Sequence, residues 1–197
     1  MEDKHYAVLI DADNISSKYI AYILDEMTKY GVITYKRIYG DWTSPQAGRW
    51  KDALMENSIV PIQQFRNTVG KNATDSTLII DAMDILYTGN VDGFCIVSSD
   101  GDFTRLASRL KESGMDVIGM GENKTPRSLR AACSVFTDLE LLLEAAEEEE
   151  ETPVRKQNKI PENIISQAVI ENAIIEIVIE NDDKGRPTGL GEIGSRL

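Results

Sequence analysis

Two apolar runs that end in aspartate constrain the fold of this chain more than any other feature. Residues 6–11 read YAVLID, and residues 93–100 read GFCIVSSD. Consecutive apolar residues over so short a stretch are typical of a parallel strand that is buried on both faces. The chain therefore needs helices on both sides of a sheet, with these two strands inside it.

Strand and helix patterns alternate through the rest of residues 1–143. The other predicted strands are 32–41, 59–65, 116–121 and 135–142, the last as a strand or a strand-like return. The predicted helices are 15–30, 47–57, 74–87, 103–112 and a short one after Pro126. This alternation predicts an α/β fold, a three-layer α/β/α sandwich with a mostly parallel sheet and right-handed crossovers. Ligands of such folds bind at the carboxyl ends of the strands.

The net charge of -12 is concentrated in one segment of the chain. Residues 144–152 contain six glutamates and no basic residue, and a proline follows them. Such a run is typical of a solvated linker, which we assign to residues 144–159. Because half of the net charge lies there, the overall acidity neither supports nor excludes a nucleic-acid partner for the first domain.

The residues after the linker predict a short C-terminal helical segment. Residues 164–181 carry a helical stripe of apolar side chains, 182–189 read DDKGRPTG, and 190–197 begin a second helix. One and a half helices bury too little apolar surface to fold alone. We therefore interpret residues 160–197 as part of a module that a partner or further chain completes.

Composition points to a cytosolic protein and excludes several site chemistries. No apolar run approaches the roughly 18 residues that span a bilayer, so we expect no membrane partner. The start of the chain also lacks the features of a signal peptide. Cys95 and Cys133 lie in apolar surroundings and are predicted to be buried free thiols. With His5 as the only histidine, a nitrogen or sulfur metal site is not expected.

Aspartates fall where the predicted strands end or the predicted helices begin. They are Asp11 and Asp13 after the first strand, Asp75 at the start of a helix, and Asp100 and Asp102 after the strand of residues 93–100. In a parallel sheet these positions can meet at one edge. Helix capping is the ordinary alternative for Asp75 and Asp102 taken singly. Several acids together favour a site for a hard divalent cation, Mg²⁺ or Mn²⁺, with Asp11, Asp75, Asp100 and Asp102 as its candidate ligands.

Three segments of the chain resemble the signature segments of the NYN domain, in its bacterial LabA-like branch. They are VLIDADN at 8–14, KNATDSTLIIDAMD at 71–84 and CIVSSDGDFTRLASRLKESGMDVIGMG at 95–121. The NYN domain belongs to the PIN-like nuclease superfamily. The resemblance implies a metal-dependent ribonuclease over residues 1–143. We expect RNA as its partner, with single strands favoured. It implies that the catalytic, metal-binding acids are Asp11, Asp75, Asp100 and Asp102, with Asn14 and Ser99 lining the site and Asp13 beside it.

A second resemblance concerns the C-terminal residues. The pattern NAIIEIV…DDKGRPTGLGEIGSRL is similar to the first part of an OST-HTH, or LOTUS, domain, a winged-helix-like module associated with RNA binding. It covers about residues 160–197. The resemblance implies an RNA or protein partner for this module.

An RNA strand also needs cations around the acidic site. Candidate cations at the same edge are Arg66, Lys71, Lys124, Arg127 and Arg130. We favour Lys71, which precedes the Asp75 helix, and Arg127, in the first turn of a helix whose N-terminus could bind phosphate. Trp42 and Phe65 are candidates to stack on bases. PIN-like domains frequently pair, so a homodimer is also expected.

Two other functions are consistent with parts of the sequence. DADN at 11–14 and SSDGD at 98–102 resemble motifs of haloacid-dehalogenase-like phosphatases, in which Asp11 would be the nucleophile and Asp13 the general acid. That family has no role for Asp75, and Asn14-Ile15 departs from its usual pattern. The second alternative is a non-catalytic RNA-binding or scaffold protein with a PIN-like fold.

Overall fold

The computed structural model describes residues 3–65 and 73–147, with side chains for all but a few of them. By its internal contacts the chain separates into Met1–Glu147 and Glu148–Leu197. The predicted C-terminal module, most of the predicted linker, Arg66 and Lys71 lie outside the described residues.

Six strands form one sheet, in the order β3-β2-β1-β4-β5-β6. They are β1 (His5–Asp11), β2 (Val32–Gly40), β3 (Val60–Gln63), β4 (Gly93–Val97), β5 (Asp116–Gly121) and β6 (Val135–Asp138). Every neighbouring pair is parallel. The predicted α/β class is confirmed, and the described sheet is parallel throughout, where a mostly parallel one was predicted.

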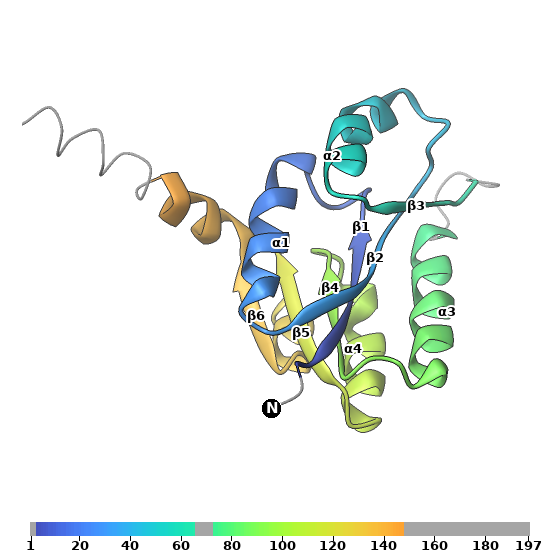
Figure 1. The fold of residues 1–197 in the computed structure, drawn as a ribbon, viewed down its shortest axis with the longest axis vertical. Coiled ribbons are helices and arrows are strands. Elements are labelled where there is room, and N and C mark those ends of the chain that lie inside the picture. Colours follow the sequence, from blue (N-terminus) through green and yellow to red (C-terminus); the bar gives the residue numbers. More distant parts are fainter. Residues whose placement is uncertain (1–2, 66–72, 148–197) are drawn as a thin grey trace, which may run out of the picture. The chain divides into compact units, whose positions relative to one another are not determined.

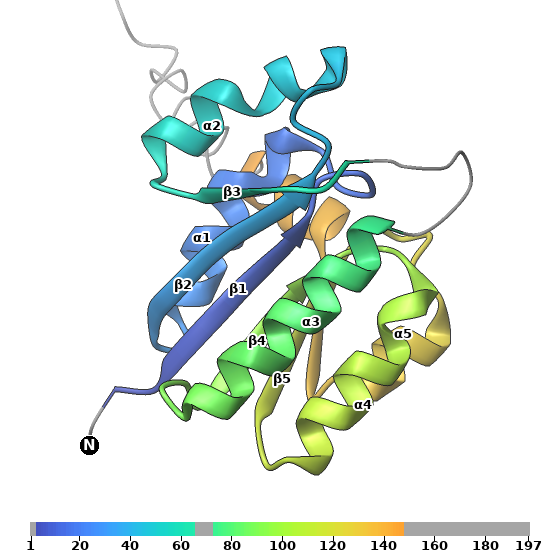
Figure 2. The ribbon, with the colours of Figure 1, turned by 90° about the vertical axis from the view of Figure 1, so that its right-hand side faces the viewer.

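The connections between the strands are helical. The α-helices are α1 (Ile20–Thr28), α2 (Lys51–Glu56), α3 (Ala73–Thr88), α4 (Thr104–Glu112) and α5 (Arg127–Ala132). The 3-10 turns η1 (Ser17–Tyr19), η2 (Pro45–Trp50) and η3 (Gly101–Phe103) lead into α1, α2 and α4. Figure 2 shows α3, α4 and α5 on one face of the sheet and α1 on the other. This is the predicted three-layer sandwich.

Strand β1 is buried on both faces, as its apolar run predicts. Tyr6, Val8 and Ile10 belong to the core beneath α1, whereas Ala7 and Leu9 belong to the core beneath α3 and α4. Because side chains alternate along a strand, Asp11 continues the row of Ala7 and Leu9. The alternation thus directs this carboxylate toward the α3 side of the sheet.

The end of the domain differs from its prediction. Residues 135–142 were expected to form a strand or a strand-like return, but β6 ends at Asp138 and residues 139–147 are helical. Leu139 is fully buried beneath the α1 face, whereas Leu141 is 64% exposed. The apolar residues that suggested a strand after Asp138 therefore belong to a helix, with one side buried against the core.

Among the helices that the structure describes, none is long and apolar enough to cross a membrane.

The order of the strands reverses its direction between β1 and β4. From β1 the chain continues outward to β2 and β3, and it then returns to add β4, β5 and β6 on the other side. A change of direction of this kind separates the loops at the carboxyl ends of the two central strands, where ligands of parallel sheets bind. In Figure 1 these carboxyl ends are at the top, near the loop that follows β1.

Candidate metal centre at the carboxyl edge of the sheet

Three aspartates meet at this edge of the sheet. Single carboxylate oxygens of Asp75, Asp100 and Asp102 all lie within 4.8 Å of one another. Asp75 is in the first turn of α3 and is only 8% exposed, Asp100 is half-buried after β4, and Asp102 is exposed in η3. The sequence predicted that these three acids converge, and the structure brings them together.

Asp100 also caps the turn that carries Asp102. Its Oδ1 atom accepts a hydrogen bond of 2.9 Å from the backbone N–H of Asp102. Capping was expected for Asp75 and Asp102, but here Asp100 is the cap. Capping does not prevent Asp100 from joining the acidic group, since one oxygen fixes η3 while the carboxylate still lies close to Asp75. The cap holds Asp100 and Asp102 in a fixed relation to each other.

Asp11 lies beside this group and is held by three donors. It is fully buried at the end of β1. Its Oδ1 atom accepts from the backbone N–H of Asp13 at 3.1 Å, and its Oδ2 atom accepts from Asn14 Nδ2 at 2.7 Å and from Ser98 Oγ at 2.8 Å. The structure thus brings together three of the four predicted ligands and places the fourth next to them.

The carboxylates repel one another strongly enough to shift their acidity. The pKa of Asp75 is raised to about 6, first by burial and then by the negative charges of Asp11, Asp100, Asp102 and Asp13. Burial also raises the pKa of Asp11, against the hydrogen bonds from Asn14 and Ser98 that favour its charged form. A divalent cation would remove this repulsion, and oxygen-only donors suit Mg²⁺ or Mn²⁺.

Sequence analysis missed Ser98 and selected its neighbour Ser99. Ser98 is 1% exposed, and its Oγ atom donates to Asp11 and accepts at 3.0 Å from the backbone N–H of Asp100. Ser99 Oγ instead accepts from the backbone N–H of Glu122 at 2.9 Å. The strand register held the missing signal: Ile10 pairs with Val97, so the next residues, Asp11 and Ser98, are neighbours.

Helix α3, which carries Asp75, is fixed to the sheet by a second acid. Asp81 accepts hydrogen bonds from the guanidinium of Arg37 and from the hydroxyl of Tyr39, both on β2. Burial and the neighbouring Asp81 raise the pKa of Tyr39 far above its usual value, so it stays a donor. Asp81 can make both contacts because α3 packs directly over β2.

The candidate cations have different positions in the structure. Arg130 donates to the carbonyl oxygens of Glu122, Asn123 and Thr125 and pairs with Asp138, so it holds the turn after β5 together. Lys124 pairs with Glu122. Arg127 is exposed at the start of α5, next to η3 and α4, where Ser128 Oγ lies 3.4 Å from Thr104 Oγ1. Helix α5 has only six residues, which weakens the prediction of a phosphate site at its N-terminus.

The two residues predicted to stack on bases, Trp42 and Phe65, differ in how far their side chains are exposed. Trp42 is partly buried, and its indole N–H donates to the carbonyl oxygen of Ile62 at 2.9 Å. This contact fixes Trp42 between the ends of β2 and β3. Phe65 is 59% exposed.

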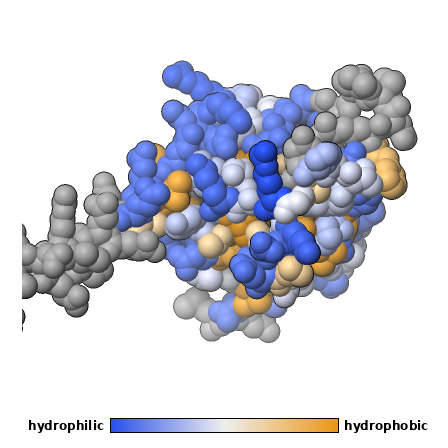
Figure 3. Space-filling view, turned by 90° about the horizontal axis from the view of Figure 1, so that it is seen from above, coloured by the Kyte–Doolittle hydropathy of each residue, from blue (hydrophilic) through white to orange (hydrophobic). Residues whose placement is uncertain are grey.

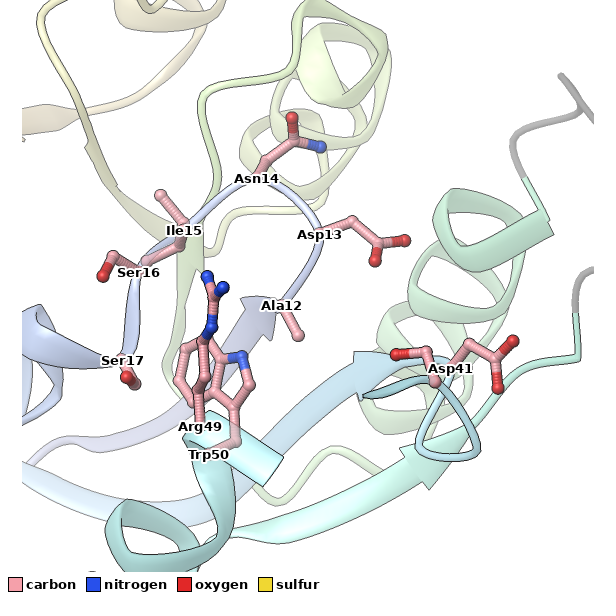
Figure 4. A pocket seen from close by; sticks show the side chains of 10 residues that line it. Ala12, Asp13, Asn14, Ile15, Ser16, Ser17, Asp41, Arg49 and Trp50 are labelled. Carbon is pink, nitrogen blue, oxygen red and sulfur yellow. The ribbon is translucent and has the colours of Figure 1, made fainter. Parts of the chain in front are cut away.

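A cavity of about 500 Å³ opens on the other side of the loop after β1. Asp13 and Asn14 line it from this loop, and Arg49 and Trp50 line it from η2 (Figure 4). Seen from above, the face around this edge carries mainly hydrophilic side chains with a few apolar ones between them (Figure 3). Sequence analysis did not predict Arg49 or Trp50, because an exposed arginine beside a tryptophan carries no motif.

The family model of the NYN domain matches residues 5–141, a span that includes all six strands and the acidic cluster. The chain belongs to the NYN domain family. This domain is part of the PIN-like nuclease superfamily, as the three sequence segments indicated. The expected fold of the nuclease superfamily with an acidic cluster is therefore confirmed.

Two relatives of this NYN domain are informative. An uncharacterized protein of Methanocaldococcus jannaschii is 28% identical over 119 residues, which cover 58% of this chain and 46% of that protein. The match thus spans less than half of that relative's length. The crystal structure of a protein of unknown function from Vibrio parahaemolyticus superimposes with a TM-score of 0.58 at 18% identity, covering 70% of this chain and 96% of that one. At this identity the likeness shows the fold alone.

Proposed function

We propose that the domain is a metal-dependent ribonuclease that hydrolyses phosphodiester bonds in single-stranded RNA. The observation that carries the proposal is the convergence of Asp75, Asp100 and Asp102 at the carboxyl edge of an NYN domain. These acids come from two elements far apart in the sequence. Family membership supports the nuclease class, and the oxygen-only donor set supports Mg²⁺ or Mn²⁺.

The chain's own residues divide the work in this proposal. A bound divalent cation would supply an activated water and neutralise charge on the phosphate. Asp75, Asp100 and Asp102 would hold the cation, and the exposed Asp102 would face the incoming strand. Asp11 is too enclosed to touch RNA, so it would complete the negative field of the site while Asn14 and Ser98 keep it in place.

The same geometry argues against the phosphatase alternative. A covalent nucleophile must reach the phosphorus atom of its substrate, but Asp11 is fully buried and already accepts three hydrogen bonds. Asp75, which has no role in that mechanism, is instead part of the acidic group. The nuclease proposal is consistent both with the burial of Asp11 and with the position of Asp75 in the acidic group.

The proposal is tested by incubating the full chain with end-labelled single-stranded RNA in Mn²⁺, Mg²⁺ or EDTA. Cleavage is expected with the metals and not with EDTA, and Asp75→Asn and Asp100→Asn should slow it by about 1,000-fold or more. Asp84→Asn is the matched control, since Asp84 is exposed on α3 away from the acidic group. A DNA strand of the same sequence tests the preference for RNA.

Two results would overturn the proposal. Cleavage that continues in EDTA or in the Asp100→Asn variant would show that the acidic group is not the active site. Intact RNA after incubation with several different single strands would favour the non-catalytic RNA-binding alternative.

A further inference from the structure

The cavity beside the acidic group has the features of a ligand site. Its volume of about 500 Å³ falls in the range of roughly 300–1,000 Å³ that small-molecule pockets occupy. Asp13 and Asn14 form part of its wall, and Asn14 also donates to Asp11. Asp13 is close enough to the acidic group to raise the pKa of Asp75. The cavity therefore adjoins the site at which a phosphodiester would be cut.

Trp50 offers the cavity a hydrogen-bond donor that the protein does not use. The residue is only 6% exposed, yet its indole N–H donates to no group among the described residues. No buried side-chain nitrogen or oxygen of the described residues lacks a partner, so this N–H retains some exposure to solvent, and Trp50 lines the cavity. Enclosed indole N–H groups usually have a hydrogen-bond partner. A ligand in the cavity would supply one.

Arg49 supplies a positive charge at the same place. Its side chain is exposed and forms no ion pair with the residues that the structure describes. Figure 4 shows Arg49 and Trp50 together, extending from η2 toward the loop that carries Asn14 and Ile15. A guanidinium binds phosphate oxygens through paired hydrogen bonds.

The positions of Trp50 and Arg49 decide which part of a nucleotide goes where. Asp13 and Asp41 also line the cavity, opposite Arg49 (Figure 4), but Asp41 Oδ1 already accepts hydrogen bonds from Thr43 and Gln63. An indole N–H can donate to a base oxygen or ring nitrogen, whereas a guanidinium prefers phosphate oxygens. The two side chains thus favour a base inside the cavity and its phosphate at Arg49.

We propose that this cavity binds one unpaired nucleotide of the RNA strand next to the phosphodiester held at the acidic group. The inference rests on the proposed ribonuclease function for the identity of the strand. A base must leave its stack to enter such a cavity, and proteins read RNA mostly through unpaired bases of this kind. Arg49 and Trp50 would thus place the strand with one phosphodiester at the acidic group.

The test measures binding of a fluorescein-labelled single-stranded RNA by anisotropy, with Ca²⁺ as the cation and the RNA checked for integrity. Arg49→Gln is expected to weaken binding about tenfold and Trp50→Phe, which keeps an aromatic ring in the core, about threefold. Lys51→Gln is the control. It also removes one positive charge, but Lys51, which follows Trp50, is exposed and does not line the cavity, so binding should change less than twofold. Thermal melting checks that each variant folds.

Two further ligands test whether the cavity takes its nucleotide from a single strand, from a duplex or from free nucleotides in solution. The same sequence as a full duplex should bind more weakly and with no dependence on Arg49. Free nucleoside monophosphates should compete only at far higher concentration than the strand. Equal dependence on Arg49 for duplex and single strand, or a monophosphate that binds as tightly as the strand, would overturn the proposal.

The outcomes keep this proposal separate from the ribonuclease proposal. If Arg49→Gln and Trp50→Phe bind RNA like the unaltered protein while that protein cleaves RNA in Mn²⁺, the cavity proposal fails and the nuclease proposal stands. If the protein binds RNA through Arg49 and Trp50 but never cleaves it, the cavity proposal stands and the nuclease proposal fails. Absence of both binding and cleavage would overturn both.

Discussion

Ser98 Oγ donates a hydrogen bond of 2.8 Å to Asp11 Oδ2, although the two residues are 87 positions apart. The bond joins the ends of the two central strands. The same Ser98 oxygen accepts from the backbone N–H of Asp100, at 3.0 Å. One hydroxyl therefore connects the buried acid to the loop that presents Asp100 to the other carboxylates.

Replacing this serine should affect both stability and metal binding. Ser98→Ala leaves Asp11 with one donor fewer and the Asp100 N–H without its acceptor, so we expect a loss of about 1–2 kcal/mol in the free energy of unfolding. Because partners of a metal ligand orient it, Mn²⁺ affinity should fall by about tenfold or more. Urea unfolding and calorimetric titration with Mn²⁺ measure the two effects.

Ser99→Ala is the matched control for this variant. Ser99 is also nearly buried, but its hydroxyl serves the backbone N–H of Glu122 and not the acids. It should lower stability by a similar amount and leave Mn²⁺ affinity within about twofold. Equal losses of Mn²⁺ affinity in both variants would contradict the role assigned to Ser98.

Asp75→Asn should stabilise the metal-free protein at neutral pH. The pKa of Asp75 is raised from 3.8 to about 6 in the folded state, so its ionisation opposes folding. Its stabilising contribution is complete below about pH 4 and is lost as the pH rises through 6. At pH 7.5 the amide should raise the free energy of unfolding by about 1–2 kcal/mol, and near pH 4 by far less. Denaturant unfolding in EDTA at both pH values measures this, and a loss of stability at pH 7.5 would count against it.

Metal binding should depend on pH through the same group. A proton on Asp75 competes with the cation, so Mn²⁺ affinity should rise by up to about tenfold per pH unit below pH 6 and level off above it. Titrations with Mn²⁺ between pH 5 and 8 follow the change. An affinity that stays constant over this range would show that Asp75 does not have to lose a proton for binding.

The contact of Asp81 with Arg37 and Tyr39 should be needed for the packing of α3. Asp81→Asn removes the charge that pairs with a partly buried guanidinium, and we expect the free energy of unfolding to fall by about 2 kcal/mol. Asp84→Asn, on the exposed side of the same helix, should change it by less than about 0.5 kcal/mol. Chemical denaturation of both variants in EDTA checks the difference, and equal effects would contradict the tether.

Sequence analysis could place the central strands and the acids because both signals are local. The run YAVLID has the pattern of a strand buried on both faces, and β1 is buried on both faces. Aspartates at strand ends and helix starts were expected to meet at one edge, and Asp75, Asp100 and Asp102 do. These inferences need only the period of a strand and the geometry of a parallel sheet.

The remaining features depend on contacts between distant residues. Arg130 looks like a surface cation in sequence, but a turn of carbonyl oxygens surrounds it in the fold. The role of Ser98 depends on the pairing of β4 with β1, and that of Asp81 depends on the position of α3 over β2. The cavity at Arg49 and Trp50 forms only where η2 faces the loop after β1. None of these arrangements leaves a pattern along the chain.

The claim on which the functional account depends is that Asp75, Asp100 and Asp102 hold a divalent cation. The most direct measurement is an anomalous-difference map from crystals of the protein soaked in Mn²⁺ near pH 7.5. We predict a peak bounded by these three carboxylates that disappears in the Asp100→Asn variant. A map with no peak at the acidic group at saturating Mn²⁺, or a peak that persists without the Asp100 carboxylate, would contradict the account.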